Sequence, residues 1–267
     1  MKVLLAIASL WLFMSAPPAV SPVRADLVDL ELVLGVDISG SVDEEEAQLQ
    51  RDGYVQALTN DKVIRAIQSG RHGRIAVTFF EWAGDHYRRT IADWAVIDGD
   101  KSAKAFAAEI AFAPIDTEIW TSISGAIGHG LDMFAFSPHT GRRRVLDISG
   151  DGPNNDGGPV TIARDAAVKA GIVINGLPII NGRVSRFGFP PMPHLDNYYR
   201  DCVIGGFGAF IVVANTYNDF ARAIRRKLIL EIAGQVPEQR PKVILASSGI
   251  HPPCDMGEII RDSRESF

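Results

Sequence analysis

Apolar runs and amphipathic segments alternate along most of the chain. Runs rich in β-branched and aromatic residues indicate six strands: Leu30–Val36, Arg74–Trp82, Arg88–Trp94, Arg144–Ile148, Ile172–Ile179 and Phe210–Ala214. Helical spacing of apolar residues indicates six helices: Asp43–Leu58, Asp61–Ser69, Ser102–Phe112, Ser122–Phe134, Val160–Ala170 and Tyr217–Ile232. This alternation predicts an α/β fold with a doubly wound, mostly parallel central sheet and helices on both faces. A short connection at residues 83–85 predicts a hairpin, and therefore one antiparallel edge strand.

The first predicted strand is followed directly by Asp37-Ile38-Ser39-Gly40-Ser41, which contains one carboxylate and two hydroxyls. Ligands in open α/β sheets collect outside the carboxyl ends of the strands, where Asp37 is expected. A second interpretation concerns Ser41 alone, because Ser41 and Glu44 fit the pattern of a capping box that begins a helix. From this segment alone, capping and metal binding are equally well supported for Ser41.

Two further segments bring oxygen atoms to the same predicted sheet edge. Thr121 begins a predicted helix, and Asp151 follows a predicted strand at the start of a loop rich in Gly, Asn and Pro. Carboxylate, hydroxyl and water oxygens suit hard cations, so Mg²⁺ is expected, with Mn²⁺ or Ca²⁺ as alternatives.

These residues resemble the metal-ion-dependent adhesion site of the von Willebrand factor type A (vWA) domain, which is written D-x-S-x-S, then a distant Thr, then a distant Asp. The resemblance extends over about Leu30 to Gly234. Within the superfamily, the chain is most similar to a bacterial group of secreted vWA-like proteins of unknown function, through residues 37–41, 149–152 and 198–202.

The resemblance implies a role for each residue. Ser39 and Ser41 would ligate the metal through their hydroxyls, and Thr121 would do so directly or through water. Asp37 and Asp151 would hold metal-bound waters, and carboxylates in that position orient the ligands and tune the ion. The cation would then accept an acidic side chain of a protein partner at its open position.

Around this site the sequence leaves several roles open. Trp120 precedes Thr121 and is expected in the core more readily than at a ligand-binding rim, while Asn154 and Asn155 are candidates for the rim. The segment 181–199 is long for a loop in a compact domain. It is expected either to form a recognition surface or to cover a sheet edge.

Residues 1–25 have the pattern of a secretory signal peptide, with Lys2 before an apolar stretch too short to span a bilayer. Cleavage would leave a vWA-like domain at 26–234 and a tail at 235–267, in an exported protein that is periplasmic or secreted and has no stable membrane span. Loss of Lys2 and Arg24 would take the formal net charge from −5 to −7, which disfavours nucleic acid as a partner. The two cysteines, Cys202 and Cys254, are expected to form a disulfide that ties the tail to the domain.

The motifs of the common enzyme classes do not appear in the sequence: there is no G-x-S-x-G, H-E-x-x-H, P-loop or dinucleotide fingerprint. The protein is therefore expected not to be an enzyme. A metal-dependent hydrolase that uses the same loops is the first alternative, with Asp156 as the candidate general base. A scaffold whose metal only holds loops together is the second. Asp147 is expected to be a polar residue at the end of a strand.

Overall fold

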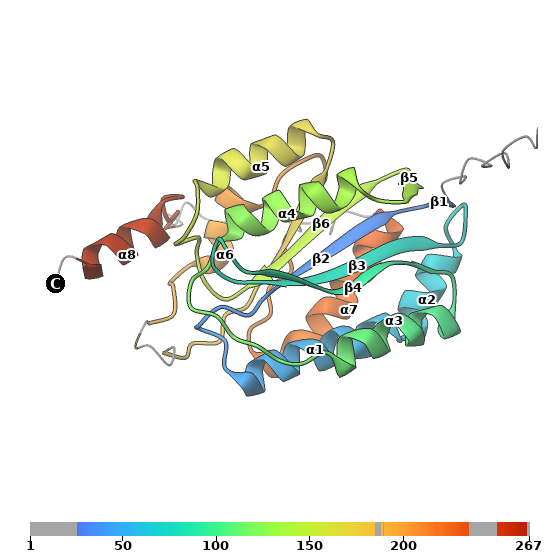
Figure 1. Ribbon diagram of the computed structural model, residues 1–267, viewed down its shortest axis with the longest axis horizontal. Helices are drawn as coiled ribbons and strands as arrows, with labels where there is room; N and C mark the ends of the chain where they lie inside the picture. The colour runs from blue at the N-terminus through green and yellow to red at the C-terminus, as the bar shows by residue number, and fades with distance from the viewer. Residues whose placement is uncertain (1–25, 185–187, 189, 235–249, 266–267) are drawn as a thin grey trace, which may run out of the picture.

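The computed structural model describes residues 26–184, 188, 190–234 and 250–265. A five-stranded sheet lies at its centre, in the order β4-β3-β2-β6-β7 (Figure 1). The strands are β2 (Glu31–Asp37), β3 (Ile75–Trp82), β4 (Arg88–Ile97), β6 (Arg144–Gly150) and β7 (Val173–Pro178). Only β3 and β4 pair antiparallel; the other neighbours in this sheet are parallel. The predicted doubly wound, mostly parallel sheet with one antiparallel edge is confirmed.

Helices cover both faces of the sheet (Figure 1). One face carries α1 (Glu44–Leu58), α2 (Asp61–Gln68), α3 (Asp100–Phe112) and α7 (Tyr217–Ala233). The opposite face carries α4 (Ile123–Ala135), α5 (Val160–Lys169) and the short π-helix η1 (Tyr199–Val203). Because both faces are covered, every residue of β2 is buried, which explains why its sequence is a continuous apolar run rather than an alternating one.

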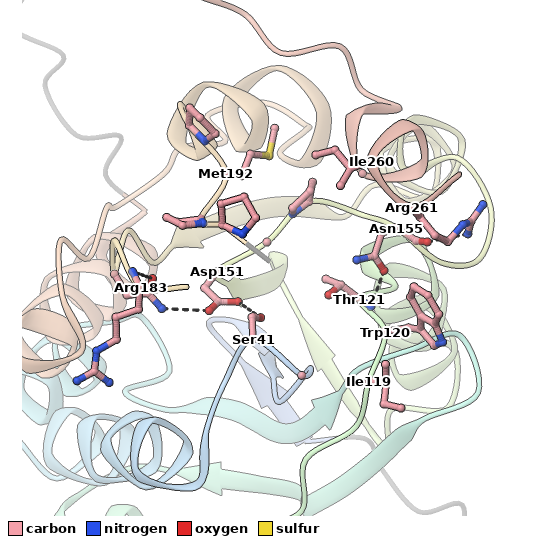
Figure 2. A pocket seen from close by; sticks show the side chains of 18 residues that line it. Ser41, Ile119, Trp120, Thr121, Asp151, Asn155, Arg183, Met192, Ile260 and Arg261 are labelled. Carbon is pink, nitrogen blue, oxygen red and sulfur yellow. Dashed lines mark hydrogen bonds between the residues drawn. The ribbon is translucent and has the colours of Figure 1, made fainter. Parts of the chain in front are cut away.

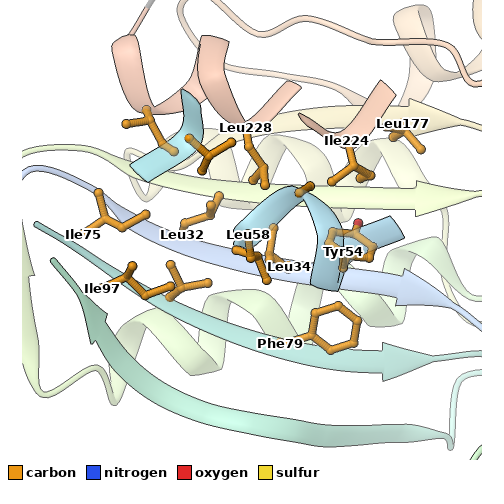
Figure 3. Packing of buried hydrophobic residues seen from close by; sticks show 14 of the residues in the cluster. Leu32, Leu34, Tyr54, Leu58, Ile75, Phe79, Ile97, Leu177, Ile224 and Leu228 are labelled. Carbon is orange, nitrogen blue, oxygen red and sulfur yellow. The ribbon is translucent and has the colours of Figure 1, made fainter. Parts of the chain in front are cut away.

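The larger core lies between the sheet and the α1 and α7 helices (Figure 3). Leu32 and Leu34 of β2 pack there with Tyr54 of α1 and Leu228 of α7, each at most 1% exposed. Burying one such side chain is worth about 1.5–3 kcal/mol relative to leaving it exposed. The smaller core on the other face includes Val33, so that successive β2 residues serve the two cores in turn. This packing holds β2 rigidly at the centre of the sheet, between β3 and β6.

Some elements differ from the sequence prediction. The segment 210–214 is not a regular strand; it lies beside β7 through isolated bridges, Gly176↔Ile211 and Ile179↔Ala214. The sequence did not predict the two short strands β1 (Asp26–Val28) and β5 (His139–Gly141), which pair with each other. It also did not predict α6 (Leu195–Tyr198), η1 or the C-terminal helix α8 (Met256–Glu265).

Helix α8 is attached to the domain by a disulfide. Cys202 and Cys254 are bonded, with 5.4 Å between their Cα atoms, as the sequence predicted. The predicted signal peptide at 1–25 lies outside the described residues, as do residues 235–249 of the tail. Within the part of the chain that the structure describes, no helix is both long enough and apolar enough to cross a bilayer.

Candidate functional site

Three loops bring a group of hydroxyls and carboxylates together at the carboxyl ends of β2 and β6. Ser39 Oγ lies 3.2 Å from Ser41 Oγ, and the Thr121 hydroxyl donates to Ser39 Oγ over 3.1 Å. The Ser41 hydroxyl donates a hydrogen bond to Asp151 Oδ1 (Figure 2). The arrangement follows from the sheet, because β2 and β6 are parallel neighbours and Val36 pairs with Ser149, one residue before each strand ends. The structure therefore brings together the residues that the sequence singled out.

Asp37 lies beneath these hydroxyls and is fully buried. Its Oδ1 accepts a hydrogen bond from the Ser39 backbone N–H at 2.7 Å, whereas Oδ2 has no hydrogen-bond partner among the described residues. Burial, and then the nearby Asp151 carboxylate, raise the pKa of Asp37 well above its usual range. The site is thus an oxygen-lined position beside a buried carboxyl group, one oxygen of which has no hydrogen-bond partner among the described residues.

Tyr199 belongs to the segment 198–202 that carries the closer resemblance, but the sequence analysis did not place it at the site. Its side chain is fully buried, and its hydroxyl has no partner among the residues described. A Cβ atom at Gly150 would lie 2.7 Å from both Asp37 Oδ2 and the Tyr199 hydroxyl, so the two groups approach each other over this glycine. Nothing in the local sequence connects Tyr199 to Asp37, because η1 reaches the site only through tertiary packing.

Ser41 is not the N-cap of α1, as the capping interpretation required. Asp43 is the N-cap, and its side chain accepts a hydrogen bond from the Glu46 N–H at 2.8 Å. The Glu46 side chain accepts one from the Asp43 N–H at 3.1 Å, which completes the capping box. The box is therefore shifted two residues along the chain, and the Ser41 hydroxyl contacts Asp151 instead.

Asparagine side chains organise the loops around the site. Asn155 Oδ1 accepts from the Thr121 N–H at 2.9 Å, and Asn181 donates to Asp151 Oδ2 over 3.2 Å (Figure 2). Asn154 was expected at the rim but is fully buried, where it accepts from the Ser124 N–H and donates to Glu258 of α8. Asn154 therefore holds the loops to one another. Asn181 lacked a recognisable signal in the sequence.

A pocket with a cavity volume of about 180 Å³ opens next to the hydroxyls, and Ser41, Thr121 and Asp151 form part of its wall (Figure 2). Trp120 was expected in the core, but it lines this pocket and is 37% exposed. The rest of the wall comes mainly from residues 190–193 and from α8. Within the segment 181–199, Asn181, Arg183 and residues 190–193 line the pocket, whereas Leu195, Tyr198 and Tyr199 are buried in the smaller core.

Two arginines lie at the pocket, and both have acidic or carbonyl partners. Arg183 Nη1 lies 3.1 Å from Glu46 Oε1. Arg261 of α8 donates to the Asn155 carbonyl oxygen over 2.7 Å and forms an ion pair with Asp262. Arg261 and the Asn154–Glu258 hydrogen bond fasten α8 to the Asp151 loop. The sequence contained no signal for this contact, which joins segments about a hundred residues apart.

Asp147 and Asp156 do not belong to the site. Asp147 is fully buried on the α7 side of the sheet, where its carboxylate lies 2.6 Å from Lys227 Nζ, so the prediction of a strand-end position is wrong. The Asp156 carboxylate accepts a hydrogen bond from the Asp85 N–H at 2.8 Å. Asp156 is not among the residues that line the pocket.

The fold is that of the vWA domain. Solved structures with this fold include proximal thread matrix protein 1 from the mussel byssus, in a form with a zinc-occupied MIDAS motif, at 16% identity and a TM-score of 0.56. That alignment covers 79% of this chain and 49% of the mussel protein, so the chain spans about half the length of that relative. A vWA protein from Catenulispora acidiphila matches at 9% identity and a TM-score of 0.53, covering 77% of this chain and 43% of that one.

A third structure, the conserved hypothetical protein BatB from Bacteroides thetaiotaomicron, is 22% identical with a TM-score of 0.51. The alignment covers 77% of this chain and all of BatB. None of the curated proteins compared with the chain matches it significantly. The chain belongs to the family described as "Protein of unknown function (DUF1194)", whose model matches residues 27–236.

Proposed function

We propose that this protein binds a divalent cation, Mg²⁺ before Mn²⁺ or Ca²⁺, and through it an acidic side chain of a protein partner. One observation carries the proposal: the oxygens of Ser39, Ser41, Thr121 and Asp151 are joined by hydrogen bonds beside the buried Asp37 carboxyl group. The vWA fold supports it, because the mussel protein with the same fold has a zinc-occupied MIDAS motif.

The chemistry of these residues fits a hard cation. Hydroxyl and carboxylate oxygens are the donors that Mg²⁺ and Ca²⁺ prefer. A buried carboxylate oxygen without a partner is costly, and a cation nearby would remove that cost. Ser39, Ser41 and Thr121 would hold the ion, and Asp37 and Asp151 would orient its waters. When bound, the cation would supply an electrophilic position for a partner's carboxylate.

The capping geometry also favours this assignment. Ser41 would have a sufficient structural role if it capped α1, but Asp43 and Glu46 perform the capping. The Ser41 hydroxyl is turned instead toward Asp151, which belongs to a loop 110 positions further along the chain. This contact keeps the Ser41 hydroxyl within the group of oxygens where the cation is proposed.

The test is titration calorimetry of Mg²⁺ and Mn²⁺ into chelator-treated protein that starts at Asp26. We expect binding in the parent and none in Asp37→Ala or Ser39→Ala. Ser124→Ala is the matched control, because Ser124 is also buried at the same end of the sheet and, among the residues described, its hydroxyl hydrogen-bonds with the Ser122 hydroxyl rather than with the cluster. Absence of binding in a cooperatively folding parent would refute the proposal.

The domain boundaries and the location of the protein belong to the same proposal. Residues 1–25 would be removed as a signal peptide, leaving the domain at 26–234 and the tail at 235–267 in the periplasm or outside the cell. The disulfide between Cys202 and Cys254 supports export, because such bonds persist in oxidising compartments. Mass spectrometry of the protein from a periplasmic extract would test this, and an N-terminus at Met1 or Lys2 would contradict it.

Binding without catalysis is better supported than hydrolysis. A hydrolase would need a general base beside the cation. Asp156, the candidate base from the sequence, accepts a hydrogen bond from the Asp85 N–H and does not line the pocket. Incubation of the Mg²⁺-loaded protein with generic phosphoesters and esters should therefore produce no turnover. Turnover that Asp37→Ala abolishes would establish the hydrolase instead.

A further inference from the structure

The wall of the pocket beside the hydroxyl cluster is polar in one part and apolar in another. Ser41, Thr121 and Asp151 form the polar part, where the cation is proposed (Figure 2). The apolar part is formed by Trp120, Met192 and Ile260, together with neighbouring prolines. These three side chains come from three separate segments of the chain, so the apolar part is a feature of the tertiary structure.

The size of the cavity limits what can enter it. Its volume is about 180 Å³. An engineered apolar cavity of roughly 150 Å³ stays dry and binds benzene. The cavity beside the hydroxyls is therefore large enough for one phenyl ring or one branched aliphatic side chain, but too small for a folded element of a partner.

The charges around the pocket indicate one anionic group rather than several. Arg183 is paired with Glu46, and Arg261 with Asp262 and the Asn155 carbonyl oxygen, so neither arginine adds an uncompensated positive charge. Asp151 adds a carboxylate to the polar part of the wall. A polyphosphate or a strongly acidic peptide would meet this carboxylate, whereas a single carboxylate at the cation would not need further cationic partners.

We propose that the partner presents an Asp or Glu directly beside a large apolar residue, preferably Phe, in an exposed segment of its chain. The carboxylate would reach the cation while the apolar side chain fills the space between Trp120, Met192 and Ile260. This inference rests on the proposed function and adds the feature that would distinguish the partner from other proteins with exposed acidic residues.

The test uses four dye-labelled peptides that are identical except at two central positions, which are Asp-Phe, Asp-Gly, Asn-Phe or Asn-Gly. Their affinities for the protein that starts at Asp26 are measured by fluorescence anisotropy, with Mg²⁺ and with a chelator. In Mg²⁺, the Asp-Phe peptide should bind about tenfold or more tightly than Asp-Gly, because burying a phenyl side chain contributes at least that factor. The Asn-Phe peptide should bind much more weakly than Asp-Phe, because it lacks the carboxylate. The chelator should abolish most of the binding of Asp-Phe.

Two variants on consecutive residues of α8 test the pocket itself. Ile260 lines the pocket, whereas its neighbour Ile259 does not and is 50% exposed. Ile260→Ser should reduce the preference for Asp-Phe over Asp-Gly by about tenfold, and Ile259→Ser should leave it unchanged. Mg²⁺ binding by calorimetry should be the same in both variants and the parent.

The outcomes separate this inference from the proposed function. Equal, Mg²⁺-dependent affinities for Asp-Phe and Asp-Gly would overturn the apolar selectivity and leave the metal-bridged contact intact. Equal affinities for Asp-Phe and Asn-Phe, or no binding of any peptide in Mg²⁺, would overturn this inference together with the metal-bridged acidic contact, whereas Mg²⁺ binding itself is decided by the calorimetry. A loss of the preference in Ile259→Ser as well as Ile260→Ser would show that the pocket wall is not its source.

Discussion

Lys227 lies between two buried carboxylates in the larger core. Its Nζ is 2.6 Å from Asp147 of β6 and 2.6 Å from Glu231 of its own helix, and all three side chains are at most 2% exposed. Asn175 of β7 donates a further hydrogen bond to Glu231 at 2.8 Å. One lysine cannot neutralise two buried carboxylates, so protonation of one of them relieves the excess charge.

Asp147 is the group that takes up this proton. Burial first, and then the Glu231 charge, outweigh the neighbouring Lys227 and raise the pKa of Asp147 from 3.8 to about 7. Because the folded state then binds a proton more tightly than the unfolded state, the stability from this group is complete below about pH 4 and is lost as the pH rises to about 7. Denaturant unfolding of the metal-free protein should show this fall, with a slope of at most ~1.4 kcal/mol per pH unit for one proton.

The Asp147→Asn variant should flatten this pH dependence, because the amide resembles the protonated acid at every pH. Asp93→Asn is the control, since Asp93 is exposed on β4 and its replacement should leave the slope unchanged. If Asp147→Asn retained the parent's slope, the proton would belong to another group, such as Asp37, whose pKa burial also raises.

The contrast between Asp147 and Asp37 shows what the sequence can predict for a single residue. Asp37 stands in a local motif that includes its partner Ser39, so its place at the sheet edge was predictable. Asp147 was misassigned because Lys227, which decides its role, is eighty residues away on α7. The positions of Asn181 and Tyr199 at the site were not predicted for the same reason, because their neighbours there are distant in the sequence.

Helix α4 contains two glycines that should respond oppositely to the same substitution. A Cβ atom at Gly128 would meet nothing within 4 Å, whereas one at Gly130 would lie 2.7 Å from Leu146 Cδ1 of β6. Gly128→Ala should therefore stabilise the protein by about 0.5–1 kcal/mol, because alanine restricts the unfolded chain and favours the helix. Gly130→Ala should destabilise it by about 1–3 kcal/mol through overpacking.

Denaturant unfolding of both variants under the same conditions measures these changes. The two variants act as controls for each other. Both positions are central in one helix, but an added Cβ atom would contact a neighbouring side chain at Gly130 and not at Gly128. Destabilisation by both substitutions would mean that α4 packs against a further surface at Gly128.

Long, periodic elements were predictable from the sequence, and short ones that depend on contacts were not. The strands of the central sheet and the helices from α1 to α7 follow from apolar runs and helical spacing, apart from α6. By contrast, β1 and β5 have three residues each, too few to show a period. The segment 210–214 has the composition of a strand, but it pairs with β7 only through isolated bridges.

At the scale of the whole molecule, the apolar wall of the pocket is built from several segments that are distant in the sequence. The hydroxyls and carboxylates come from loops at one sheet edge, which the fold class predicts. The apolar wall requires residues 190–193 and α8, and α8 is held there by the disulfide, Arg261 and Glu258. The polar half of the site could therefore be predicted from the sequence, and the apolar half could not.

Because the polar half of the site does not depend on α8 and the apolar half does, removal of the disulfide should affect the two halves differently. In a Cys202→Ala/Cys254→Ala variant, the free energy of unfolding should fall by up to about 4 kcal/mol, because the bond closes a long loop in the unfolded chain. Mg²⁺ affinity should stay close to that of the parent, since the hydrogen bonds among Ser39, Ser41, Thr121 and Asp151 do not involve α8.

The preference for the Asp-Phe peptide should decrease in the same variant, because Ile260 would no longer be held against the pocket by a covalent bond. Calorimetry and anisotropy on one preparation measure the two properties together, with the parent in reducing buffer as the matched comparison. A variant that lost Mg²⁺ binding while it still unfolded cooperatively would show that α8 supports the polar half as well. The separation of the site into a metal-binding edge and a selective wall would then be wrong.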